Sequence, residues 1–414
     1  MPGKSLLANS AIQARTARPS YLYPTLHLIA ACAAVVLAGC GGDGDGDGSA
    51  TKAVASGGSS ATQPYTSRRG GSRNPTTPTT PTTPTTPTTP TTPTTPTTPA
   101  TGGACYTVSG SVPAPANTTV VSLLPARGAG VGNYTVLGEP RTAGLCYVNF
   151  RREQVGLPPL VARTALGTAA QNHTSYMLAN NLLTHSEQSG KPGYTGATPD
   201  ARIQAVYPTN ATAEVVAGAN RWTSVANAQL SLSPKDALVV DLLNAPFHRA
   251  ALLGGYQSAG SGYAESVGPN GSGTAATYFQ TIDLADASKA GADNLMVAYP
   301  FDGQTDVPPT WVNNESPNPA PGYEGKTIGY PVLLQAINTS LQFTADTFTL
   351  TDAQGRNVSC LKVDSRSAGM SSYARGLAIC TPQSPLVSKQ RYSVTVAGKL
   401  GTQPVNLSWS FTTR

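Results

Sequence analysis

The stretch of sequence that decides the fold of the middle of this chain is CYVNFRREQVGLPPL, residues 146–160. Its apolar Cys146, Tyr147 and Phe150 recur at helical spacing, and the GLPPL that follows stops a helix because proline lacks an amide hydrogen. Apolar residues spaced at i, i+3, i+4 and i+7 predict a second helix over residues 162–183.

Short motifs follow this stretch at regular intervals, and together they carry a family resemblance. The segments are YVNFRREQVGLPPL (147–160), AAQNHTSYM (169–177), LTHSE (183–187), TAEVVAG (212–218), NAPFHRAAL (244–252), GSGYAES (260–266) and YFQTIDLA (278–285). In this order they resemble the CAP superfamily of cysteine-rich secretory, antigen five and pathogenesis-related one proteins, in its bacterial SCP-like branch. No single motif is specific, but six or seven in order are. The resemblance covers residues 141–288.

The resemblance implies an α-β-α sandwich whose cleft holds two histidines and one or two glutamates. Carried over motif by motif, the cleft residues are His185 in LTHSE, Glu214 in AEVVAG and His248 in APFHR. Where the family has Gly-Glu-Asn, however, this chain has Ala213 and Val215 around the glutamate. A looser cleft with fewer acidic groups is therefore expected.

Three further positions bear on this cleft. Leu242 stands where the family usually has a tryptophan, and the second glutamate has no clear equivalent; Asp241 is nearby, but nothing in the sequence assigns it. His173 precedes His185 by 12 residues, which on one unbroken helix is about 120° around the axis. We therefore expect His173 to lie outside the cluster.

The chemistry of the expected site has two readings. Two imidazoles and one carboxylate can hold Zn²⁺ with a position open to water, with His185 and His248 as the histidine ligands. They can equally form a hydrogen-bonded network that shapes the cleft walls. Ser186 adjoins His185, but neighbouring residues do not face one another, so the two are no catalytic dyad. Binding without catalysis is the favoured expectation.

The N-terminal segment predicts export and a lipid anchor. An apolar run of 14 residues, Leu26 to Gly39, ends in Leu-Ala-Gly and is followed by Cys40. This run is too short for a membrane span, which needs about 20 residues. The pattern resembles a bacterial lipoprotein signal peptide, residues 1–40, in which Cys40 becomes the lipidated first residue. Gly41 after it resembles lipoproteins sent to the outer membrane where the organism has two membranes.

Residues 41–104 predict a disordered linker because they contain almost no apolar side chains. Within them Pro75 to Pro99 repeats Pro-Thr-Thr with a period of three, which favours polyproline II. At about 3.1 Å per residue, this repeat extends roughly 80 Å. We expect a stalk that holds the folded part away from the lipid surface.

Charge argues against nucleic acid as a partner. The chain has 27 basic and 21 acidic residues, but Lys4, Arg15 and Arg18 precede Cys40 and leave with the signal peptide. The remaining 24 basic and 21 acidic residues differ by only three, and they form no dense basic run.

The cysteines predict disulfides. With Cys32 in the signal peptide and Cys40 lipidated, four of the six cysteines remain, and an exported chain normally pairs such a remainder. The simplest of three connectivities is Cys105–Cys146 with Cys360–Cys380.

The two flanks of the CAP-like segment read as β structure. Residues 105–140 are rich in strand and turn signals, and residues 294–414 contain short period-two strands that fit a β-sandwich. This C-terminal part resembles bacterial immunoglobulin-like domains. The whole chain is expected to be an α+β protein that binds a hydrophobic small molecule, a lipid or another envelope component. A metal-dependent hydrolase acting on peptide or cell-wall material, and a purely structural adhesin, are the alternatives.

Overall fold

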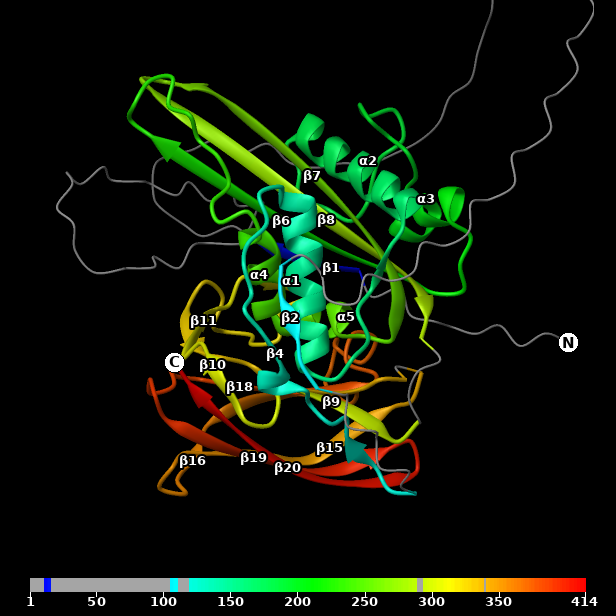
Figure 1. Ribbon diagram of the computed structural model, residues 1–414, viewed down its shortest axis with the longest axis vertical. Helices are drawn as coiled ribbons and strands as arrows, with labels where there is room; N and C mark the ends of the chain where they lie inside the picture. The colour runs from blue at the N-terminus through cyan, green and yellow to red at the C-terminus, as the bar shows by residue number, and fades with distance from the viewer. Residues whose placement is uncertain (1–10, 16–104, 111–118, 289–292, 339) are drawn as a thin grey trace, which may run out of the picture. The chain divides into compact units, whose positions relative to one another are not determined.

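The computed structural model describes residues 11–15, 105–110, 119–288, 293–338 and 340–414 (Figure 1). Cys40 and the Pro-Thr-Thr repeat, on which the predictions of a lipid anchor and a stalk rest, lie outside these ranges. The described residues all belong to one compact unit of the chain. Within the described ranges, none of the helices combines the length and the apolar character that a membrane span needs.

The helices lie in the first half of the folded part, and both predicted helices are present. Helix α1 begins at Pro140 because the Glu139 side chain accepts a hydrogen bond from the amide of Thr142, which caps the first turn. Helix α2 ends at Asn180, and Asn181 then takes a left-handed conformation with φ 47° that turns the chain back. The helices are α1 (Pro140–Gln154), α2 (Thr164–Asn180), α3 (Pro199–Val206), α4 (Ala237–Asn244), α5 (Pro246–Leu252) and the 3-10 turn η1 (Gly128–Gly130).

These helices cover both faces of a central sheet, which gives the predicted α-β-α layering (Figure 1). Side chains alternate along its strands: Val216 packs with Met177 of α2, whereas Val215 and Ala217 join the core on the α1 and α4 side. The strand order is β12-β1-β6-β8-β7-β5. The strands are β1 (Ala11–Arg15), β5 (Val161–Ala162), β6 (Thr212–Thr223), β7 (Tyr256–Asn270), β8 (Gly273–Ala287) and β12 (Glu315–Ser316).

Two members of this sheet come from outside the CAP-like segment. Strand β1 lies within the predicted signal peptide and pairs in parallel with β6 and antiparallel with β12. Strand β12 belongs to the C-terminal part of the chain. The central sheet therefore joins three separate parts of the sequence.

The C-terminal part is a β-rich region of several sheets. One five-stranded sheet has the order β10-β20-β19-β15-β16 and another the order β17-β18-β14-β9-β3, and the strands β11 and β13 form a further pair. A separate pair, β2-β4, precedes helix α1 in the sequence and contacts it through β4. The strands of the first sheet are β10 (Gln304–Val307), β15 (Phe343–Thr351), β16 (Asn357–Val358), β19 (Arg391–Leu400) and β20 (Gln403–Thr413). Those of the second are β3 (Ser122–Leu123), β9 (Leu295–Tyr299), β14 (Val332–Ala336), β17 (Cys360–Val363) and β18 (Leu377–Pro382). The paired short strands are β2 (Thr107–Val108), β4 (Val131–Gly132), β11 (Thr310–Val312) and β13 (Thr327–Gly329).

The two large sheets differ in how far they follow the predicted period of two. Strand β19 alternates, with Tyr392, Val394 and Val396 buried between exposed residues. Strands β9, β14 and β18 are buried along their whole length. Their second face is covered, because Phe247 of α5 packs against Leu333 and its neighbours. A sheet covered on both sides needs apolar residues at every position.

The α+β segment and the β-rich region are bound together by a buried cation. The guanidinium of Arg249 on α5 is fully buried and donates to the carbonyl oxygen of Pro331, and to those of Leu243 and Asn244. It also lies 4.7 Å from the ring centres of both Tyr299 and Tyr330. The two parts therefore share one interior and are not independent domains joined by a linker.

Both predicted disulfides are confirmed. Cys105–Cys146 ties the segment before α1 to that helix across 41 residues of sequence. Cys360–Cys380 joins the neighbouring strands β17 and β18 across 20 residues.

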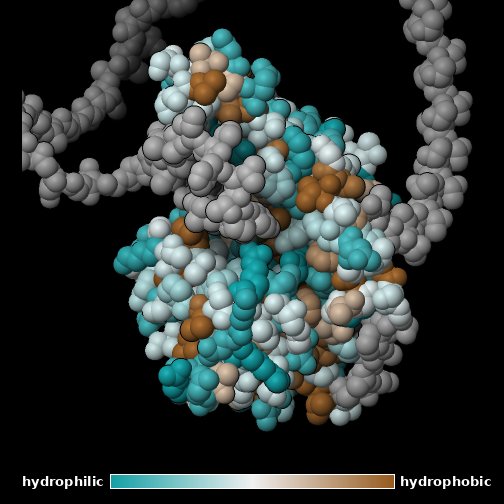
Figure 2. Space-filling model, turned by 60° about the vertical axis from the view of Figure 1, so that its left-hand side comes forward, coloured by the Kyte–Doolittle hydropathy of each residue, from teal (hydrophilic) through white to brown (hydrophobic). Residues whose placement is uncertain are grey.

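The outer surface carries only scattered apolar groups on the face shown in Figure 2, where hydrophobic residues form small separate areas among hydrophilic and neutral ones. The large apolar side chains that are exposed, such as Val225, Val267 and Val387, also lie far apart in the sequence. On this face the colouring gives no single broad apolar area.

Candidate functional site

A cluster of buried charged side chains gathers where α2, α3 and β6 meet. We call it the Glu214 cluster: His173, His185, Glu187, Arg202 and Glu214. Glu214 stands on β6 with its side chain fully buried, and its Oε1 lies 2.8 Å from Nδ1 of His185. His185 comes from the loop after α2 and keeps 13% of its side chain exposed. Two of the three residues expected to converge, His185 and Glu214, are thus in contact.

Arg202 on α3 binds the second carboxylate oxygen of Glu214. Its Nη2 donates to Glu214 Oε2 at 2.6 Å and to the carbonyl oxygen of His185 at 3.0 Å. Burial by itself raises the pKa of Glu214, but His173, the hydrogen bond with His185 and the charge of Arg202 outweigh it and lower the pKa to about 2. Both oxygens of this carboxylate are therefore engaged, and it stays ionised.

His173 belongs to the cluster, which differs from the prediction that it lies outside. Its Nδ1 is 2.9 Å from Glu187 Oε1, its Nε2 is 2.7 Å from the carbonyl oxygen of Thr184, and the same Nε2 is 3.7 Å from Glu214 Oε1. The helical angle was the wrong guide because α2 ends at Asn180 and the chain folds back before His185. Turn geometry, not helical phase, brings the two histidines to one carboxylate.

Glu187 is a member of the cluster that sequence reasoning missed. Its side chain is fully buried and accepts hydrogen bonds from the amides of Thr195 and Gly196, at 2.6 Å and 3.2 Å, besides its contact with His173. Burial raises its pKa, but the bonds to His173 and Thr195 and the charge of Arg202 outweigh that effect and lower it. Its place in LTHSE, two residues after His185, was the only signal available in the sequence.

A second buried carboxyl stands beside Glu214 on the neighbouring strand. Asp283 on β8 is the register partner of Glu214 on β6 and is only 1% exposed. Burial and the negative charge of Glu214 raise the pKa of Asp283 well above its usual range. The pair therefore holds one ionised and one neutral carboxyl.

His248 is placed in a different pair. It lies fully buried on α5, and its Nδ1 is 2.7 Å from Oε1 of Glu315 on β12. The same oxygen accepts from the backbone amides of Phe247 and His248, at 2.8 Å and 2.9 Å. The described contact of the His248 side chain is thus with Glu315, a residue of the C-terminal region. Of the three residues predicted to converge, His185 and Glu214 contact each other, and His248 contacts Glu315.

The model of the cysteine-rich secretory protein family, CAP, matches residues 145–281. Residues 145–281 are a CAP domain. No curated protein matches the chain.

Solved structures similar to the chain include two bacterial proteins. An outer surface protein from Borrelia burgdorferi is 17% identical with a TM-score of 0.25, and the match covers 35% of this chain and 90% of that one. An extracellular protein containing an SCP domain from Bacillus anthracis is also 17% identical with a TM-score of 0.25. That match covers 36% of this chain and 40% of the other, so this chain spans less than half of the Bacillus protein's length.

The first motif of the CAP domain is explained by structural contacts. The side chain of Asn149 bonds to both the amide and the carbonyl of Leu160, which clamps the GLPPL turn to α1. The buried guanidinium of Arg152 donates to the carbonyl oxygens of Pro158, Leu252, Gly254 and Tyr256. Burial lowers the pKa of Arg152 to about 9. This motif builds the fold and not the site.

The metal reading of the CAP domain gains no geometric support. Among the residues that the structure describes, no group of three or more His, Cys, Asp or Glu side chains is arranged to hold a metal ion. The two predicted histidine ligands contact different carboxylates, His185 with Glu214 and His248 with Glu315. In both contacts the histidine lies beside a buried carboxylate and compensates its charge.

Asp241 on α4, the nearby acid that the sequence left unassigned, is partly buried. Burial raises its pKa to about 7. No hydrogen bond joins its carboxyl to the Glu214 cluster within the described ranges. It is an acid that solvent exclusion keeps neutral below pH 7.

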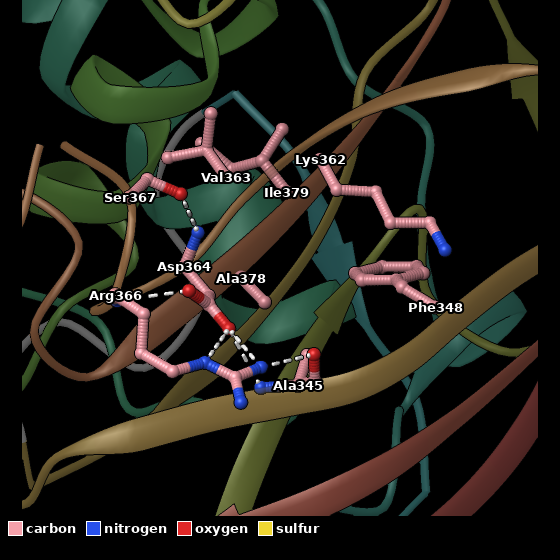
Figure 3. Close-up of a pocket in the computed structure, with 9 residues that line it drawn as sticks. All are labelled: Ala345, Phe348, Lys362, Val363, Asp364, Arg366, Ser367, Ala378 and Ile379. Carbon is pink, nitrogen blue, oxygen red and sulfur yellow. Dashed lines mark hydrogen bonds and ion pairs between the residues drawn. The ribbon is translucent and has the colours of Figure 1, made fainter.

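A cavity of about 210 Å³ lies in the β-rich region, away from the Glu214 cluster (Figure 3). In Figure 3 Asp364 lies between Arg366 and Ser367 and bonds to both, while Lys362 extends beside the ring of Phe348. The other residues that line the cavity, Val363, Ala378 and Ile379 among them, are apolar. None of the residues of the Glu214 cluster lines it.

Proposed function

We propose that this protein is an exported, lipid-anchored envelope protein whose CAP domain binds a ligand and does not catalyse a reaction. The observation that carries the proposal is the state of Glu214. Both of its oxygens are held, by His185 and Arg202, in a buried network whose charges compensate one another. A general base must instead reach the proton that it abstracts, so a carboxylate held on both sides is poorly suited to that role.

Export is supported by the disulfides as well as by the signal sequence. Disulfides persist in oxidising compartments and are rare in the bacterial cytosol. Two disulfides in a chain that opens with a lipoprotein signal therefore agree with a location outside the cytoplasm, at the outer membrane where the organism has two. The Pro-Thr-Thr repeat then places the CAP domain away from the lipid surface.

We infer that the β-rich region is an immunoglobulin-like platform for the CAP domain. Two five-stranded sheets that pack against each other support this, together with the alternating burial of β19. Strand β3, which precedes the CAP domain in sequence, pairs with β9, so the platform is completed from both ends of the chain. Such a platform holds the CAP domain in a fixed orientation.

The ligand of the CAP domain is proposed to be a hydrophobic small molecule, a lipid or another envelope component. To test this, the lipidated protein is titrated with cis-parinaric acid, a fluorescent fatty acid, while its hydrolysis of casein and of purified peptidoglycan is measured with and without added Zn²⁺. We expect saturable fluorescence and no hydrolysis above that of the His185→Ala variant. Zn²⁺-dependent hydrolysis that is lost in His185→Ala would establish the hydrolase instead. If the protein neither binds the fatty acid nor hydrolyses either substrate, that result would favour a structural adhesin.

The anchor has its own test. Wild type is expected to incorporate labelled palmitate and to remain with membranes, whereas Cys40→Ser loses the label because the acyl-accepting thiol is gone. The neighbouring Cys32→Ser variant is the matched control and should behave like wild type. Equal labelling of wild type and Cys40→Ser would overturn the anchor.

A further inference from the structure

A slot one strand wide separates two backbone edges in the central sheet. Strand β1 (Ala11–Arg15) fills it, pairing residue by residue with 214–218 of β6 and, through Gln13 and Ala14, with 315–316 of β12. Paired strands lie about 4.8 Å apart, so the edges of β6 and β12 are roughly 9.6 Å apart. We call the space between these two edges the strand slot.

The first wall of the strand slot is held without help from β1. Strand β6 pairs with β8 along its whole length, from Thr212 opposite Ala285 to Thr223 opposite Thr274. Near the start of β6, the side chain of Glu214 is also held by His185 and Arg202. This wall therefore keeps its position whether or not the slot is filled.

The second wall is held by the contacts of Glu315 with Phe247 and His248. Oε1 of Glu315 on β12 accepts from the backbone amides of Phe247 and His248 and lies 2.7 Å from Nδ1 of His248. Three hydrogen bonds thus fasten β12 to the first turn of α5. Helix α5 in turn lies against β6, β1 and β14, so both walls rest on the same support.

The strand in the slot comes from a part of the chain that is predicted to leave. Ala11–Arg15 lies within the signal peptide, and cleavage before Cys40 removes it. Removal takes away the strand that pairs with residues 214–218 of β6 and with the two residues of β12, and strand edges pair readily with another extended chain. A slot with two edges supplies backbone partners to both sides of that chain.

We propose that the strand slot is a binding site for an extended polypeptide segment of another envelope protein, and that Ala11–Arg15 occupies it until the signal peptide is removed. The proposal rests on the proposed function for that removal and for the location in the envelope. Recognition is mainly through the main chain. In the observed register an alanine stands opposite each wall glutamate, Ala11 at Glu214 and Ala14 at Glu315, so small residues are expected at those two positions.

The test compares two forms of the full chain that differ in whether the slot is vacated. One is the processed lipoprotein in detergent, and the other is Cys40→Ser, which cannot be lipidated and keeps residues 1–39. The probe is a dye-labelled peptide of residues 8–18, ANSAIQARTAR, and binding is measured by fluorescence anisotropy. We expect the processed form to bind the peptide at least tenfold more tightly than Cys40→Ser, whose slot is filled by its own β1.

Backbone methylation tests whether both edges are used. Successive residues of a strand direct their amide groups to opposite neighbours, so Gln13 and Ala14 serve different walls. N-methylation at either residue should weaken binding about tenfold, since each removes one hydrogen bond. A peptide that pairs with one edge alone would be weakened by only one of the two methyl groups, and that result would overturn the two-edged slot.

Failure of the proposed export and failure of the strand-slot proposal can be distinguished. The mass of the processed protein shows whether cleavage has occurred before Cys40, which tests the proposed function alone. If the protein is cleaved and the peptide does not bind, the strand slot is refuted and export stands. If it is not cleaved, the slot is tested within the chain: Gln13→Cys with Ser316→Cys, which are register partners, should form a disulfide on oxidation, whereas Gln13→Cys with Ser367→Cys should not. Failure of the first pair to form would overturn the proposal.

Discussion

At the scale of single residues, the CAP domain is notable for the number of charges that it buries and for how it compensates them. Glu214, Arg202 and Glu187 have side chains that are at most 2% exposed, and each has an opposite charge or an imidazole beside it. Such networks contribute little when complete but cost much when one partner is removed, because the other charge is left buried.

Glu214→Gln is therefore expected to lower the free energy of unfolding by about 3–5 kcal/mol, since Arg202 loses its closest anion. The measurement is urea denaturation with the disulfides intact. Glu265→Gln, an exposed position on β7, is the control and should change stability by no more than about 0.5 kcal/mol. Equal effects of the two substitutions would show that the cluster is not a coupled network.

The same substitution has a pH signature. The pKa of Glu214 is lowered from 4.5 to about 2, so its stabilising effect is complete above pH 4.5 and is lost as the pH falls towards 2. The difference between wild type and Glu214→Gln should accordingly shrink as the pH falls below 4.5. A constant difference from pH 7 to pH 3 would mean that the charge of Glu214 is not what stabilises the fold.

For Asp241 we expect the opposite dependence of stability on pH. Burial raises its pKa from 3.8 to about 7, so the folded state binds the proton more tightly and wild type loses stability as the pH rises from 3.8 to 7. Asp241→Asn removes this loss. Its stability advantage over wild type should be about 1–2 kcal/mol larger at pH 8 than at pH 5, with the partial exposure of Asp241 reducing the full effect. The check is the urea midpoint of both proteins at both pH values.

At the scale of elements, the GSGYAES motif of β7 sets how closely α2 approaches the sheet. Gly260 and Gly262 lie on one face of β7, and a Cβ atom on either would meet the backbone of α2, at Leu166 and Gly167 or at Ala170 and Gln171. Helix α2 carries His173, so this close approach also positions a member of the Glu214 cluster.

Gly262→Ala is expected to cost about 2–3 kcal/mol of stability, because helix backbone must move to admit the methyl group. Gly268→Ala on the same strand is the matched control, since nothing lies within 4 Å of its added Cβ. Thermal denaturation of both variants gives the comparison. A Gly262→Ala protein as stable as the control would mean that α2 does not pack as described.

At the scale of the whole molecule, the CAP domain and the β-rich region behave as one structural unit. The buried guanidinium of Arg249 bonds to Pro331 across the boundary, and the amide of Gln335 donates to the carbonyl oxygens of Ala250 and Leu253. Neither part can open along this boundary without exposing these buried groups.

We therefore expect the two parts to unfold together. In native-state hydrogen exchange, the most protected amides of β8 in the CAP domain and of β19 in the β-rich region should report the same free energy of opening and the same dependence on denaturant. Separate values, with β19 opening while β8 stays protected, would mean that the regions are independent domains.

Local features of the fold followed from the sequence, whereas contacts between distant residues did not. Helical spacing predicted α1 and α2, strand patterning predicted the β-rich region, and cysteine order predicted both disulfides. In the candidate site, the motifs placed His185, Glu214 and His248 in one cleft. His185 contacts Glu214, and the described contact of His248 is with Glu315. The motifs gave no reason to add His173, Glu187 or Arg202, which also belong to the cluster.

What the sequence by itself determined was local, because the period of apolar residues, a proline stop or a short cysteine loop depends on neighbours close along the chain. Only the tertiary structure decided that α2 ends before His185, that β14 is buried on both faces, and that Glu315, 67 residues after His248, is its partner. Such contacts arise when distant segments pack into one core, and their energy comes from burial that no short stretch of sequence can display.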